Sequence, residues 1–96
     1  MALALGATVW IPCEVKPGPF SNERLVRVDG RPEPWVGFVP VWYLREPLDH
    51  GATEVRAVVA ALHDDRFLAR IPGHAVRLHV VEQSLDRAKP LGPLPA

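Results

Sequence analysis

Eleven prolines interrupt this 96-residue sequence so often that long helices are nearly excluded. A proline lacks a backbone N–H group and its ring clashes with the preceding turn, so that it ends or kinks a helix. The prolines recur through the first three quarters of the chain, at Pro12, Pro17, Pro19, Pro32, Pro34, Pro40, Pro47 and Pro72. The sequence therefore predicts a fold built from short segments.

Between the prolines, apolar and other residues alternate with period two, which is typical of a half-buried strand. The clearest case runs from Thr8 to Val15, with one apolar face formed by Val9, Ile11, Cys13 and Val15. The same pattern predicts strands at 24–28, 35–41, 66–71 and 77–83. Residues 54–62 are ambiguous, because their alanines favour a helix and their valines a strand. The short turn after them, followed by renewed alternation, favours the strand.

The length allows a single domain with one core. Hydrophobic residues make up 48% of the chain, enough for a core without metals or disulfides. We expect residues 1–86 to form one β domain and residues 87–96 to be a flexible, proline-rich tail. In that tail, Arg87, Pro90 and Pro93 match the order of a polyproline ligand, a match that arises easily in such a composition.

A faint internal repeat divides the domain into halves at 6–47 and 51–87. "GAT" occurs at 6–8 and at 51–53, "RLVRVDG" at 24–30 is echoed by "FLARIPG" at 67–73, and "VPVWYLRE" at 39–46 by "VVEQSLDR" at 80–87. If the repeat is genuine, two three-stranded halves pack together, because neither could bury its apolar face alone. We therefore expect an all-β fold, a small barrel or sandwich of about six short antiparallel strands.

Charge and cysteine content exclude several classes of function. The 11 basic residues balance 11 acidic ones, so no excess charge draws the chain to nucleic acid or to an anionic membrane. No apolar run approaches the roughly 18 residues of a membrane span. The single Cys13 cannot form an internal disulfide, and the N-terminal residues lack the basic start of a secretory signal. These features predict a cytoplasmic protein without a membrane partner.

The octapeptide "GFVPVWYL", residues 37–44, resembles the segment near the end of a Src-homology-3 domain. The matching positions are Gly37, Pro40 and Tyr43, with Trp42 where that family usually has asparagine. In the family, the proline and the tyrosine lie in an aromatic groove that receives polyproline II peptides. The resemblance implies a Src-homology-3-like barrel and makes Pro40 and Tyr43 candidates for peptide binding.

The aromatic residues are the leading candidates for a binding site. Trp10, Trp35, Trp42 and Tyr43 could form a platform for a peptide, a base or a cation, or could instead fill the core. Alternation places Trp10 and Trp42 on the face opposite the apolar one, so we expect both to be exposed. The predicted peptide-binding residues are Trp10, Pro40, Trp42 and Tyr43.

A second candidate site is an arginine-bearing sheet face that could bind nucleic acid, because guanidinium groups match phosphate geometry. Its members would be Arg24, Arg27, Arg56, Arg66, Arg70 and Arg77. Interleaved acidic residues favour a mixed solvated face instead.

Nothing in the sequence predicts an enzyme, a metal site or a cofactor. Cys13 has no neighbouring base that would make it a nucleophile, and the histidines lack the spacing of metal ligands. We therefore expect a non-enzymatic interaction module that binds a protein or peptide through the aromatic surface or an exposed sheet edge. The alternative is a nucleic-acid-binding barrel, and exposed edges would also allow a homodimer.

Overall fold

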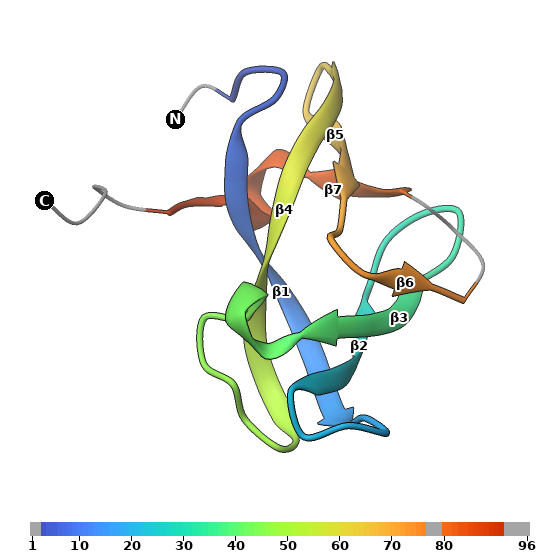
Figure 1. Ribbon diagram of the computed structural model, residues 1–96. Coiled ribbons are helices and arrows are strands. Elements are labelled where there is room, and N and C mark those ends of the chain that lie inside the picture. Colours follow the sequence, from blue (N-terminus) through green and yellow to red (C-terminus); the bar gives the residue numbers. More distant parts are fainter. Residues whose placement is uncertain (1–2, 77–79, 92–96) are drawn as a thin grey trace, which may run out of the picture.

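The computed structural model describes residues 3–76 and 80–91, and in these ranges the chain is all-β. Two single turns of 3₁₀ helix, η1 and η2, accompany eight strands (Figure 1). The elements are β1 (Thr8–Pro17), β2 (Glu23–Val28), β3 (Trp35–Pro40), η1 (Val41–Tyr43), β4 (Gly51–His63), β5 (Arg66–Arg70), β6 (His74–Ala75), β7 (Val80–Ser84), η2 (Leu85–Arg87) and β8 (Lys89–Pro90). The predicted all-β class is confirmed.

The strands form one curled antiparallel sheet in the order β6-β3-β2-β1-β4-β5-β7, with β8 added to β1. The long strands β1 and β4 lie side by side at its centre, paired from Thr8 opposite Val58 to Val15 opposite Gly51. Figure 1 shows β2 and β3 at one end of this central pair and β5 and β7 at the other. The sheet thus curls into a half-barrel around the apolar side chains.

Strand alternation places the core as the sequence predicts. The four apolar residues of Thr8–Val15 are buried, and so are Val55, Ala57 and Val59 of β4 and Phe67, Ala69 and Ile71 in and after β5. The prediction of a strand at 54–62 is confirmed, because β4 spans it. Near the other end of the chain, the prediction for 77–83 is confirmed from Val80 onward, whereas 77–79 lie outside the described residues.

The third predicted strand ends one residue early, at Pro40. Val41 begins η1, and its N–H group donates a 2.9 Å hydrogen bond to the carbonyl of Asn22. The ladder with β2 likewise stops at the pair Glu23–Pro40. The prediction that the strand includes Val41 is therefore wrong.

Apart from β6, which lies between β5 and β7, the same order of three strands and a 3₁₀ turn occurs twice in the described chain. β1, β2, β3 and η1 are followed by Leu44, which bridges to Val55 of β4. β4, β5, β7 and η2 lead to β8, whose Lys89 pairs with Trp10 of β1. The number of residues that separates Leu44 from Lys89 equals the number that separates Trp10 from Val55. The Leu44–Val55 bridge and the Lys89–Trp10 pair are therefore related by an approximate twofold axis. The sequence repeat between 6–47 and 51–87 itself stays a prediction.

Part of the predicted tail belongs to the sheet. Ala88 is buried, and Lys89 and Pro90 pair with Trp10 and Val9. The expectation of a flexible tail from residue 87 is therefore wrong for these three residues, since antiparallel pairing with β1 holds them in place. The pairing also incorporates Pro90 of the polyproline-like pattern into the fold. Residues 92–96, which contain Pro93, lie outside the described part of the chain.

The edge strand β7 contacts the loop between β2 and β3. Arg31 of this loop bridges to Glu82 of β7, with hydrogen bonds of 3.2 and 2.9 Å between their backbone groups. The side-chain amide of Gln83 also donates to the carbonyl of Asp29. Gly30 lies so close to β7 that a Cβ atom would come within 2.6 Å of the Glu82 carbonyl oxygen. A glycine is therefore needed here because the loop backbone lies close to β7. Its backbone φ is not positive, although an Asp-Gly turn would allow that conformation.

Candidate binding surface

The turn η1 presents Trp42 on a backbone that is fixed at both ends. The N–H group of Val41 is bonded to Asn22, and the N–H group of Leu44 donates a 3.1 Å hydrogen bond back to the Val41 carbonyl. Leu44 itself is buried and bridges to β4. The Trp42 side chain is 60% exposed, as the sequence predicts.

Tyr43 follows Trp42 and is half-buried against the core. The two aromatic rings lie with their centroids 6.3 Å apart and their planes tilted by 46°. Pro40, which is also half-buried, precedes the turn with a backbone φ of −58° and ψ of 141°. Three of the four predicted peptide-binding residues therefore lie in η1 or immediately before it.

Beside Tyr43 lies a groove of about 280 Å³ on the outer face of the central strands. Tyr43 forms part of its wall, and Val58, which is partly exposed, lines it from β4. The remaining lining residues are Thr8, Arg56, Ala57 and Pro72. The groove thus offers apolar surface and a single charged group, Arg56, and its described lining contains no acidic residue.

The prediction that Trp10 is exposed is wrong, because only 9% of this residue is accessible. Trp10 is opposite Arg56 in the ladder between β1 and β4, and the Arg56 guanidinium lies over the indole ring, 5.5 Å from its centroid. On the other edge of β1, Trp10 is paired with Lys89 of β8. The outer face of β1 is therefore covered here by side chains that sequence alternation alone does not reveal. Trp35 is fully buried in the core.

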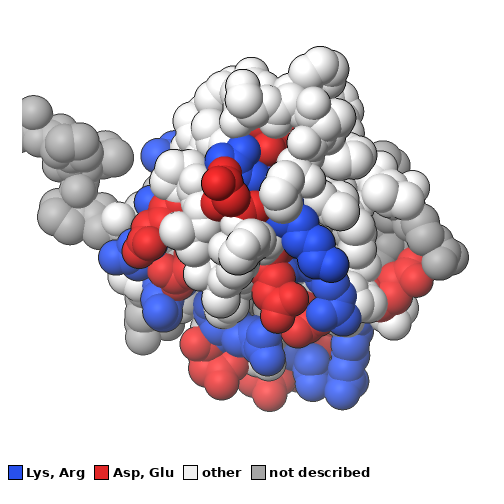
Figure 2. All heavy atoms as spheres, turned by 90° about the horizontal axis from the view of Figure 1, so that it is seen from below, with Lys and Arg blue, Asp and Glu red and all other residues white. Residues whose placement is uncertain are grey.

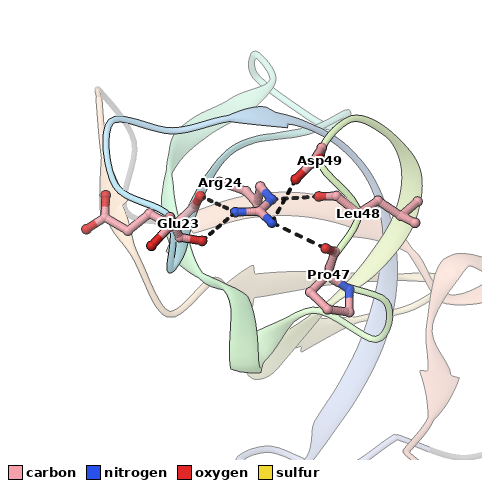
Figure 3. A network of polar contacts seen from close by, with 6 residues as sticks. Glu23, Arg24, Pro47, Leu48 and Asp49 are labelled. Carbon is pink, nitrogen blue, oxygen red and sulfur yellow. Dashed lines mark hydrogen bonds and ion pairs between the residues drawn. The ribbon is translucent and has the colours of Figure 1, made fainter.

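The predicted arginine face does not include Arg24, which is buried. Its guanidinium donates hydrogen bonds to the carbonyl groups of Leu48, Ser21, Glu23 and Pro47 and to a carboxylate oxygen of Asp49 (Figure 3). The expectation that Arg24 shares a solvated face with the other arginines is wrong, because the loop after η1 closes over it.

The other arginines of that set differ in their surroundings. Arg27 and Arg66 form ion pairs of 3.1 Å with Asp29 and Glu82. Arg56 and Arg70 are exposed, and Arg77 lies outside the described residues. Figure 2 shows basic and acidic side chains interleaved over the lower face of the molecule. That face offers a mixture of both charges rather than a basic stripe.

Cys13 is buried, and its surroundings oppose ionisation. Burial raises the pKa of its thiol to about 12, the negative charges of Glu54 and Glu14 act in the same direction, and a backbone hydrogen bond from Thr53 acts in the opposite one. Within 3–76 and 80–91, no three histidine, cysteine or acidic residues are grouped so that they could hold a metal ion.

Sequence reasoning did not assign Thr8, Val58 or Pro72 to the peptide site, and it assigned Arg56 only to the alternative nucleic-acid face. These residues come together because β1 pairs with β4 along most of its length. The alternation of residues in β4 predicts that Arg56 and Val58 face outward. Their proximity to Tyr43 could not be predicted from the sequence, since it depends on the pairing of distant strands.

Comparison with known proteins gives the chain no relatives. No family model matches it, and neither the curated proteins nor the solved structures include a significant match. Among the residues that the structure describes, there is no helix of the length and hydrophobicity needed to cross a membrane.

Proposed function

We propose that this chain is a non-enzymatic interaction module, a Src-homology-3-like barrel that binds an extended peptide across Trp42, Tyr43 and the adjacent groove. The observation that carries the proposal is the exposed Trp42 on the fixed turn η1. A rigid, exposed aromatic side chain provides a large contact area at a small cost in conformational entropy.

The approximate twofold supports a role for Trp42 beyond folding. η2 repeats the hydrogen bonding of η1: the N–H group of Leu85 donates a 2.8 Å bond to the Asp65 carbonyl, and that of Ala88 a 3.1 Å bond to Leu85. The middle residue of η2 is Asp86, where η1 has Trp42. The same turn therefore forms with a charged residue at this position, so the tryptophan is not required for the turn and needs another explanation.

The groove supports a peptide as the occupant. It lies next to Tyr43 and has a volume of about 280 Å³. By the resemblance of residues 37–44, Pro40 and Tyr43 would correspond to the positions that contact polyproline II peptides in Src-homology-3 domains. An extended peptide could place one side chain in the groove and stack a proline on the exposed indole.

The proposal can be tested by selecting peptides from a phage-displayed random 12-residue library on the purified protein. Selected peptides are then synthesised, and their affinities are measured by fluorescence polarisation. We expect Trp42→Ala to weaken binding at least about tenfold, because central aromatic residues dominate such interfaces. Phe20→Ala is a matched control, since Phe20 is similarly exposed, at 65%, but lies in the loop between β1 and β2.

Failure to enrich any peptide, or equal affinity for the wild type and Trp42→Ala, would contradict the proposal. Sedimentation equilibrium provides a further check. A dimer that dissociates in Trp42→Ala would show that a second copy of the chain, rather than a peptide, occupies this surface.

A further inference from the structure

We propose that the groove selects peptides carrying an acidic residue next to an apolar one, with Arg56 binding the carboxylate. This inference rests on the proposed function and adds the chemistry of the partner. Apolar surface from Val58 and Tyr43 would hold the apolar side chain, and among the described residues that line the groove the one charged residue is the basic Arg56.

Arg56 has no acidic partner among the described residues, like the exposed Arg31, Arg70 and Arg87 and unlike three other outward-facing arginines. Arg27, Arg45 and Arg66 each lie within 3.1 Å of a carboxylate oxygen, from Asp29, Glu54 and Glu82 respectively. For Arg56, no carboxylate of the described residues is within ion-pair distance, and its contact is the ring of Trp10. Stacking on an indole face leaves the N–H groups at the edge of the guanidinium free to donate.

That stacking also prepares Arg56 for binding. A long side chain held against a ring loses less conformational freedom when it forms a new ion pair. Trp10, although buried, would thereby contribute to the site as a positioning residue that supports the guanidinium from below.

Arg70 adds a second positive charge on the same face. It is the cross-strand partner of Val58 in the β4–β5 ladder, and directly opposed residues of an antiparallel pair project to the same side of the sheet. Arg70 is exposed, and in 3–76 and 80–91 it has no ion pair with an acidic residue. Val58 therefore has two basic neighbours, Arg56 on its own strand and Arg70 on the paired strand β5.

An acidic peptide fits this surface better than nucleic acid. Nucleic-acid binding gains its affinity by neutralising several phosphates at once. Here two free arginines flank an apolar groove, and the chain as a whole has no net charge. One carboxylate beside one apolar side chain matches this arrangement, whereas a run of phosphates does not.

The test compares three focused libraries of the form acetyl-Ala-Pro-X-Z-X-Pro-Ala-amide, in which Z is Glu, Gln or Lys. Binding is measured to the wild type, Arg56→Gln, Arg56→Lys, Arg70→Gln and the control Arg27→Gln. We expect the wild type to retain the Glu library about tenfold more strongly than the Gln library, and the Lys library least. The preference should shrink at 0.5 M salt.

Arg56→Gln should abolish the preference for Glu over Gln, Arg70→Gln should reduce it, and Arg27→Gln should leave it unchanged. Arg56→Lys keeps the charge and should restore part of the preference. Thermal unfolding of each variant identifies any change that is due to misfolding.

The outcomes separate the two proposals. Equal, Trp42-dependent binding of all three libraries would overturn the acidic preference and leave the peptide site standing. If no library bound in a Trp42-dependent way, the proposed function would fail. Arg56-dependent binding of a 12-residue oligothymidylate that is tighter than that of the Glu library would overturn the inference in favour of nucleic acid.

Discussion

The Nε atom of Arg24 donates a 2.6 Å hydrogen bond to the carbonyl oxygen of Leu48, and this contact fastens the loop after η1 to strand β2. Four further acceptors surround the same guanidinium, of which three are backbone carbonyl groups (Figure 3). The side chain of the fourth, Asp49, is 86% exposed. The backbone carbonyl groups, rather than the ion pair with Asp49, therefore account for most of the stabilisation.

Replacement of Arg24 by methionine should lower the free energy of unfolding by about 3 kcal/mol, because it removes charge-assisted hydrogen bonds from a buried site. The measurement is urea denaturation followed by circular dichroism. Arg27→Met is the control, since Arg27 pairs with Asp29 at the surface and should contribute less than about 1 kcal/mol. Equal losses in the two variants would show that the Arg24 network is not stabilising.

Gly30→Ala should destabilise the junction between the β2–β3 loop and β7 by about 2 kcal/mol, because the added methyl group overlaps the backbone at Glu82. Amide exchange should also speed up at Arg31 and Glu82, whose N–H groups bond across that junction. Gly18→Ala is a milder control, with its nearest atom 3.1 Å away. If the protein tolerated Gly30→Ala as well as Gly18→Ala, the close approach would not exist.

Cys13 should make the protein less stable in alkali. Its thiol pKa is about 12 in the folded protein, compared with an ordinary value of 9.0, so between these values the unfolded chain has lost a proton that the folded chain keeps. The unfolded state is then favoured as the pH rises, by about 1 kcal/mol per pH unit.

This effect is measured as the difference in unfolding free energy between the wild type and Cys13→Ala at several pH values. The difference should be constant below pH 9 and should change in favour of Cys13→Ala above it. At pH 8, Ellman's reagent should not label the thiol of the native protein and should label it only after the protein is unfolded. Rapid labelling of the folded chain would contradict the burial of Cys13.

Tryptophan fluorescence should report one accessible indole. Iodide is expected to quench Trp42, whereas Trp35 is fully buried and Trp10 nearly so. Trp42→Phe should leave emission that iodide barely affects, while Trp10→Phe should retain a quenchable fraction. An unchanged quenchable fraction in Trp42→Phe would place the exposed indole elsewhere.

Local geometry explains why much of the fold could be predicted. Successive side chains of a strand point to opposite faces, so alternation along Val9, Ile11, Cys13 and Val15 identified buried positions without knowledge of the neighbouring strands. Prolines excluded long helices for an equally local reason. The exposure of Trp42 was predicted from the same kind of pattern, but Trp42 lies in η1 rather than in a strand, so alternation is not the physical reason for it.

Three features could be recognised only from the folded structure, because each depends on residues far apart in the sequence. Trp10 is covered by Arg56 and flanked by Lys89, Arg24 is enclosed by the loop at 47–49, and β8 pairs with β1. The groove at Tyr43 arises in the same way. Residues of one strand determine which of their side chains face inward, but strand pairing over long distances decides what lies against the outward face, and only the completed sheet brings those partners together.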